Sequence, residues 1–132
     1  MKISLSTNWC NEKFESGEEI AELAASLGFD ELELGFRTTE KQVEGFKRKI
    51  DLIPIGSIHA FCPIPMSAPR GSPELYSLAS FSDDARAIAR FHILKNARFA
   101  ADIGADSVVL HAGSVRLNSF FRKSYCTSAL ED

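Results

Sequence analysis

Two histidines stand where predicted strands end, in the runs Ser57-Ile58-His59-Ala60-Phe61 and Val109-Leu110-His111-Ala112-Gly113. Neutral imidazole is a good ligand for zinc and related divalent ions, and two imidazoles on neighbouring strands are able to share one ion. We therefore predict that His59 and His111 are metal ligands. The alternative is a pair of polar histidines, each hydrogen-bonded to its own neighbours at the rim of the sheet.

Glu33 is a candidate catalytic carboxylate. It lies on the polar side of a predicted strand, shortly before that strand ends at Gly35. A carboxylate there is placed to join the metal ligands, to orient a histidine or to contact a substrate hydroxyl group. The alternative is a solvated or ion-paired carboxylate, and for the deeper Glu31 we expect this structural role.

Asn8 and Trp9 follow the first predicted strand and are candidate substrate-binding residues. The amide suits a polar ligand, and the indole ring is able to stack on the apolar side of that ligand. Simple packing of Trp9 within its loop is the alternative.

Three other features offer chemistry that we do not assign to the site. His92 falls in the middle of a predicted helix, so we expect no catalytic role for it. Cys62 has no predicted base beside it and is rejected as a nucleophile. The basic residues near the end of the chain are expected to be solvated, and these are Arg116, Arg122 and Lys123.

The elements that must position these residues alternate between strands and helices. Helix starts are predicted at Ser16, at Thr38 or Thr39 and at Ser82, and helix stops at Gly28 and Gly104. Predicted strands cover residues 3–6, 31–34, 55–59 and 107–111. Residues 61–80 hold the prolines that forbid regular structure, so they form a long loop that is either a lid or a rigid surface segment.

This order predicts a parallel sheet with right-handed crossovers. Alternate strand residues give one polar face and one apolar face, and the apolar face comprises Ile3, Leu5, Leu32, Leu34, Ile58, Val108 and Leu110. A doubly wound sheet is covered on both faces and would be apolar throughout, so the polar face favours the interior of a (β/α)8 TIM-type barrel. Active sites of such barrels lie at the C-terminal strand ends, where both histidines stand.

The chain of 132 residues holds only about four βα units, whereas a complete barrel needs about 250 residues. We therefore expect one partial TIM-barrel domain over 1–132, the N-terminal half, with 114–132 as an incomplete loop or helix. The chain is then a fragment of a longer one, the product of a truncated gene, or a half that pairs with another copy.

The composition narrows the classes of partner. A net charge of −3 with scattered basic residues gives no footprint for a phosphate backbone, so nucleic acid is not expected as a partner. No apolar run approaches the length of a membrane span. The odd number of cysteines, at Cys10, Cys62 and Cys126, favours reduced thiols and a cytoplasmic protein.

The segments 28–34, 58–61 and 108–113 resemble the xylose-isomerase-like superfamily, over residues 1 to about 113. It contains sugar-phosphate isomerases and epimerases and the family 2 AP endonucleases. In the endonuclease branch, histidines that end strands three and four are zinc ligands, which the resemblance implies for His59 and His111. That branch commonly has proline where this chain has Ala112. In the isomerase branch the metal is held mainly by residues of the second half of the barrel.

The resemblance implies a metal-dependent sugar or sugar-phosphate isomerase or epimerase-like protein. A divalent ion (zinc, manganese or magnesium), incompletely liganded by this chain, would polarise a carbonyl while carboxylates move the proton. A homodimer or a missing C-terminal half would complete the barrel, so we expect no measurable isomerase activity from these residues alone. The alternatives are a zinc-dependent AP endonuclease-like phosphodiesterase and a non-catalytic half-barrel that self-associates.

Overall fold

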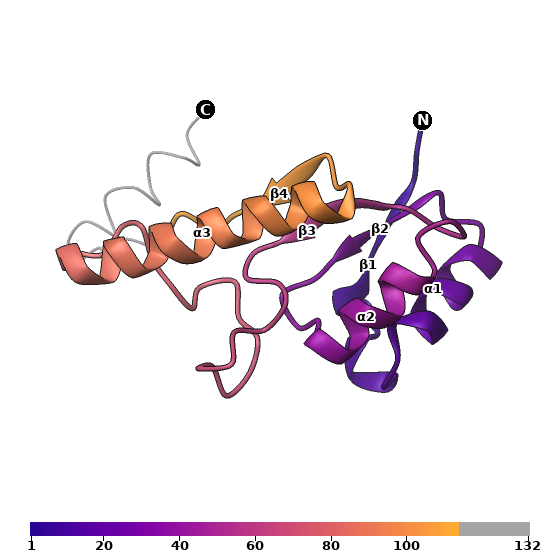
Figure 1. The fold of residues 1–132 in the computed structure, drawn as a ribbon, viewed down its shortest axis with the longest axis horizontal. Helices are drawn as coiled ribbons and strands as arrows, with labels where there is room; N and C mark the ends of the chain where they lie inside the picture. Colours follow the sequence, from indigo (N-terminus) through magenta and orange to yellow (C-terminus); the bar gives the residue numbers. More distant parts are fainter. Residues whose placement is uncertain (114–132) are drawn as a thin grey trace, which may run out of the picture.

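The structure, a computed structural model, describes residues 1–113, in which strands and helices alternate along the chain (Figure 1). The elements are β1 (Ser4–Ser6), α1 (Gly17–Ser26), β2 (Glu31–Leu34), α2 (Glu40–Arg48), β3 (Ile55–His59), α3 (Asp83–Ile103) and β4 (Ser107–Val109), with the short 3-10 turns η1 (Thr7–Trp9) and η2 (Asn11–Lys13) after β1. This alternation confirms the predicted α/β class. The expected loop or helix over 114–132 lies outside the described residues, and so do Cys126, Arg116, Arg122 and Lys123.

All four strands are parallel and follow one another in the order β1-β2-β3-β4. Leu5 pairs with Leu32, and Ile58 lies between Leu34 and Val108. Each new strand is therefore added beside the one before it, which confirms the predicted parallel sheet. The same order begins both open parallel sheets and barrels.

One hydrophobic core holds the helices against a single face of the sheet. It joins strand residues to residues of every helix, namely Leu32, Leu34, Ile55, Ile58, Ile20, Ala24, Phe46, Ala100 and Ile103. Side chains alternate between the faces of a strand, so Ser6, Glu33 and Ser57 point to the opposite face, where they are half-buried. Within residues 1–113, the predicted polar face is the one that the core helices leave uncovered.

The alternation of faces is interrupted once, at a bulge in β3. Leu32 pairs with Ile55 but Glu33 pairs with Ser57, so Gly56 is an extra residue in the ladder. The Glu31 carboxylate occupies the space where a β-carbon on Gly56 would lie. It also forms an ion pair with Lys2, with Oε2 3.2 Å from the Lys2 Nζ. Glu31 thus has the structural role expected of it.

The helix ends follow the local signals in the sequence. Ser16 and Thr39 each open a helix with a reciprocal capping box, and the Ser82 hydroxyl accepts a hydrogen bond from the Ala85 amide at 3.3 Å. Gly104 ends α3 at φ +78°, in the left-handed region that favours glycine. No helix in residues 1–113 is long and apolar enough to cross a membrane.

Two strands are shorter than predicted. β1 begins at Ser4, leaving Ile3 52% exposed, and β4 ends at Val109 instead of His111. The last bond of the β3–β4 ladder runs from the Ala60 amide to the Val109 carbonyl at 2.9 Å. Because β3 itself ends at His59, the residues after Val109 have no strand partner and leave the ladder.

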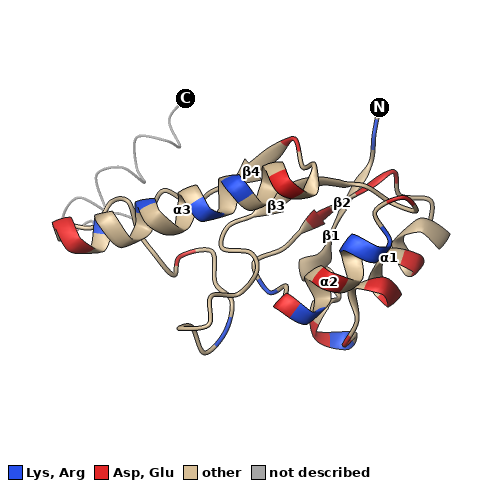
Figure 2. Ribbon diagram, viewed as in Figure 1, with Lys and Arg blue, Asp and Glu red and all other residues tan. Residues whose placement is uncertain are grey.

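α1 and α2 pack against each other at unusually close range. Ion pairs link them on the outside, including Arg48 with Glu18 at 2.6 Å, and Figure 2 shows both signs of charge on these helices. Exposed ion pairs contribute little to stability. The contact is made instead by Gly17 and Gly45. A β-carbon on Gly17 would overlap the Gln42 carbonyl of α2, and one on Gly45 would crowd the Gly17 and Glu18 amides of α1.

The segment from β3 to α3, residues 60–82, has no regular secondary structure, as the prolines predicted. Its first part is nevertheless fixed to the core. Buried Asn96 brackets Cys62, because its Nδ2 donates to the Cys62 carbonyl at 2.8 Å and its Oδ1 accepts from the Cys62 amide at 3.2 Å. The Ile64 amide donates to the Thr38 carbonyl at 2.9 Å, which joins this segment to the β2–α2 connection.

Candidate functional site

The two predicted metal ligands lie side by side at the C-terminal edge of the sheet. The ring centroids of His59 and His111 are 5.2 Å apart, and the ring planes are inclined by 58°. His59 is the last residue of β3 and pairs with Val109, the last residue of β4. His111 comes two residues after Val109. The topology of adjacent parallel strands therefore brings together two imidazoles that are far apart in the sequence.

A backbone contact orients the His59 ring. Its Nδ1 lies 3.1 Å from the Ala60 carbonyl oxygen, which can only accept a hydrogen bond. This contact places the proton on Nδ1 and leaves the lone pair on Nε2. A ring oriented in this way is typical of histidines that bind metal through the other nitrogen.

Two residues that the sequence did not point to, Phe36 and Glu74, lie beside the histidines. The Phe36 ring meets the His59 ring edge-on, with centroids 5.1 Å apart. Glu74 Oε1 lies 4.0 Å from Nδ1 of His111. Phe36 could have been found, since it lies two residues after the end of β2. Glu74 could not, because nothing local tells where a residue of the irregular segment will lie.

Glu33 lies deeper in the sheet than the histidines. It pairs with Ser57, two positions before His59, and its Oε1 accepts a hydrogen bond from the Ser6 hydroxyl at 2.7 Å. Among residues 1–113, no three histidine, cysteine or acidic side chains are grouped so that they could hold a metal ion. The described part of the chain thus offers two imidazoles, and Glu33 is not a third ligand beside them.

Asn8 and Trp9 lie in η1, at the end of β1. Asn8 Oδ1 accepts a hydrogen bond from the Arg37 amide at 3.3 Å, and its amide group covers Gly35 so closely that a β-carbon there would overlap it. Asn8 therefore joins the ends of β1 and β2. Trp9 is 56% exposed, with the Lys13 ammonium 5.6 Å from its ring centroid. No contact within the described residues joins either side chain to the histidine pair.

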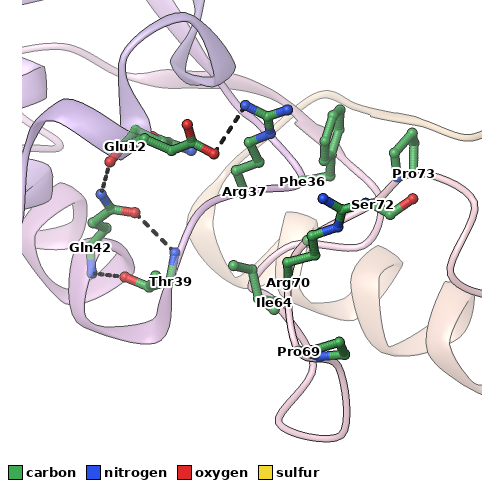
Figure 3. Close-up of a pocket in the computed structure, with 12 residues that line it drawn as sticks. Glu12, Phe36, Arg37, Thr39, Gln42, Ile64, Pro69, Arg70, Ser72 and Pro73 are labelled. Atoms are coloured by element: carbon green, nitrogen blue, oxygen red, sulfur yellow. Dashed lines mark hydrogen bonds and ion pairs between the residues drawn. The ribbon is translucent and has the colours of Figure 1, made fainter.

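A cavity of about 510 Å³ is lined in part by Phe36 and lies between η2, the β2–α2 connection and residues 69–73 (Figure 3). Its wall combines apolar and polar side chains, namely Phe36, Ile64, Pro69, Pro73, Asn11, Glu12, Arg37, Thr39, Gln42, Arg70 and Ser72. None of these residues was expected to belong to a site. No local sequence pattern marks them, because the wall comes from three segments of the chain that only the fold brings together.

His92 is half-buried on α3, beside the segment that follows β3. Its ring stacks on Tyr76 with centroids 4.0 Å apart and planes 8° from parallel. Burial, together with nearby Lys95, holds the pKa of His92 below its usual value. The residue therefore packs α3 against the segment that follows β3.

Cys62 is expected to resist alkylation in the folded protein. Burial raises the pKa of its thiol to about 12, and the thiolate is the reactive form, so almost none is present at about pH 8. Iodoacetamide followed by peptide mass spectrometry should leave Cys62 unmodified in buffer and modify it fully in urea. Rapid labelling in buffer would contradict the burial described above.

Neither a known family model nor a curated protein matches the sequence of this chain. The chemistry open to the histidine pair therefore has to follow from its geometry. Two neighbouring imidazoles, one of them with an oriented lone pair, suit the binding of a divalent cation. The half-buried carboxylate of Glu33 lies on the same face of the sheet, level with Ser57, two residues before His59.

Proposed function

We propose that the chain forms the first half of a (β/α)8 barrel of the xylose-isomerase-like type and acts in a metal-dependent sugar or sugar-phosphate isomerase or epimerase. The observation that carries the proposal is the pairing of His59 with His111, 5.2 Å apart at the C-terminal strand ends. In barrels of this class, that is the end at which active sites are built.

Two features of the sheet support the barrel. Within residues 1–113, β1 and β4 each pair with a strand on one side only, and open parallel edges invite further pairing. The helices pack on one face, while the face with Ser6, Glu33 and Ser57 is polar. Four further strands, from a longer chain or from a second copy, would close both edges and enclose this face.

The residues present fit part of a metal site. His59 and His111 would hold the ion, with the His59 tautomer set by the Ala60 carbonyl. Zinc in proteins usually has at least three protein ligands, so the remaining ligands would come from outside residues 1–113. When bound, the ion would polarise the carbonyl of the sugar.

The other candidate residues would assist the substrate. Glu33, held by the Ser6 hydroxyl, would accept or return a proton or fix a sugar hydroxyl. Asn8 and Trp9 would contact the sugar from the end of β1, with the exposed indole face available for stacking. Glu74 would orient His111 by accepting a hydrogen bond from its Nδ1 after a small approach.

The proposal is tested by metal-dependent incorporation of deuterium from D₂O next to the carbonyl of aldoses and ketoses, followed by NMR. The completed assembly, isolated from its source, should exchange the proton with added zinc, manganese or magnesium. The 132-residue chain alone should not, because the proposal takes the remaining ligands and the proton-transferring carboxylates from the other half of the barrel. If neither form exchanges the proton nor binds a divalent ion, the isomerase proposal is wrong.

A zinc-dependent AP endonuclease-like phosphodiesterase is the second candidate. It is favoured by the same histidine pair, which lies at the ends of β3 and β4, and opposed by the net charge of −3. Cleavage of an oligonucleotide with one abasic site, in the presence of zinc, would place this function first. A chain that dimerises without metal or turnover would instead be the non-catalytic half-barrel.

A further inference from the structure

The cavity beside Phe36 has the size and the mixed wall of a small-molecule site. Its volume of about 510 Å³ falls within the range of about 300–1,000 Å³ typical of ligand pockets. Phe36, Ile64, Pro69 and Pro73 provide apolar surface, and the rest of the wall is polar. A ligand that fits this wall carries both a hydrocarbon part and a polar group.

The charged residues of the wall indicate which sign of charge the polar group of the ligand carries. Arg37, Arg70 and Glu12 are the charged residues of the wall. Arg37 already pairs with Glu12, Nη1 to Oε1 at 3.1 Å, whereas Arg70 has no ion pair within residues 1–113. The positive charge of Arg70 is thus unpaired among the described residues, on an exposed side chain that lines the cavity beside Phe36 and Ser72 (Figure 3). A guanidinium group in this position suits an oxyanion, which it binds through parallel N–H donors.

The wall is held in place by contacts on opposite sides. The Gln42 Nε2 donates to the carbonyls of Asn11 at 2.9 Å and Phe14 at 2.8 Å. On the other side, Gly71 lies so close to the Phe36 carbonyl that a β-carbon would overlap it. One side is thus pinned to α2 and the other lies against the β2–α2 connection, so little ordering remains to oppose binding.

We propose that this cavity binds a small organic oxyanion, a phosphate monoester or a carboxylate. Its charged group lies against the Arg70 guanidinium and its hydrocarbon part against Phe36, Ile64 and the prolines. Binding needs no metal ion, so it is independent of the function proposed for the histidine pair. Since Phe36 also touches His59, the ligand lies next to that pair without using it.

Titration calorimetry in EDTA tests the proposal with phenyl phosphate, benzoate, inorganic phosphate and phenol as probes. One saturable site is expected for phenyl phosphate or benzoate, and the tighter of the two identifies the anionic group. Inorganic phosphate lacks the hydrocarbon part and phenol lacks the charge, so both should bind at least about tenfold more weakly.

Arg70→Gln should weaken binding of the tighter probe by about tenfold or more. The matched control is Arg90→Gln, which removes the same charge from an exposed position on α3 and should leave the dissociation constant unchanged. Equal effects of the two variants, equal binding of phenol, or no saturable binding of either anion would overturn the proposal. Because Arg70 is exposed, Arg70→Gln is expected to keep the fold. The melting temperatures of both variants check this.

Discussion

Replacing His59 or His111 by alanine is expected to weaken binding of zinc or cobalt by more than about 100-fold, beyond the effect usual for residues that only support a ligand. The two rings lie 5.2 Å apart and would share one ion, so removing either leaves a single protein ligand in residues 1–113. The double variant should be no worse than either single one, since the site is already lost. Calorimetric titration of the metal-free protein measures all three.

His92→Gln is the matched control, because it removes an imidazole that stacks on Tyr76 away from the pair. Its metal affinity should equal that of the unmodified chain. If the losses in metal-binding free energy of His59→Ala and His111→Ala simply add in the double variant, the two rings bind metal separately. Unchanged affinity in both would leave them as the polar rim histidines of the alternative interpretation.

Gly17→Ala is expected to lower the free energy of unfolding by about 3 kcal/mol or more, as severe overpacking does. Alanine in place of glycine normally favours a helix by about 0.5–1 kcal/mol. Here the added β-carbon would overlap the Gln42 carbonyl oxygen and approach the Phe46 ring to 2.9 Å. A backbone carbonyl cannot rotate aside as a side chain can, so α1 would have to move away from α2.

Urea unfolding followed by circular dichroism measures this loss as a shift of the midpoint. Gly104→Ala is the comparison, since a β-carbon there meets open space and the only cost is the left-handed backbone at φ +78°. That cost is about 1–2 kcal/mol. A smaller loss for Gly17→Ala than for Gly104→Ala would show that the helices do not pack through this glycine.

Local signals were enough to predict the elements. The capping residues Ser16 and Ser82 and the stop at Gly104 act on backbone groups within one turn, so their effect is visible in the sequence. The strands over 31–34 and 55–59 were predicted with the bounds they have in the structure, because short β-type runs lie between these signals. The bulge at Gly56 was missed, since it depends on pairing with β2.

The candidate site divides in the same way. The placement of His59 and His111 at the ends of successive strands could be predicted, because parallel neighbours bring their C-terminal ends to one edge. Glu33 was placed on the correct face, but its distance from the histidines depends on the strand register. The contact of Asn8 with a ligand stays a prediction, and its contacts with Arg37 and Gly35, which join β1 to β2, were not foreseen.

The sequence by itself determined the alternation of strands and helices, the polar face and the two histidines at strand ends, because these follow from short-range capping and from the period of side chains along a strand. Only the tertiary structure decided that Phe36 and Glu74 flank the histidines and that Arg70 meets Arg37 around a cavity. Those residues come from the irregular segment after β3 and from the β2–α2 connection. Their meeting depends on contacts such as Asn96 with Cys62 and Gly71 with Phe36, which join distant parts of the chain and leave no local pattern.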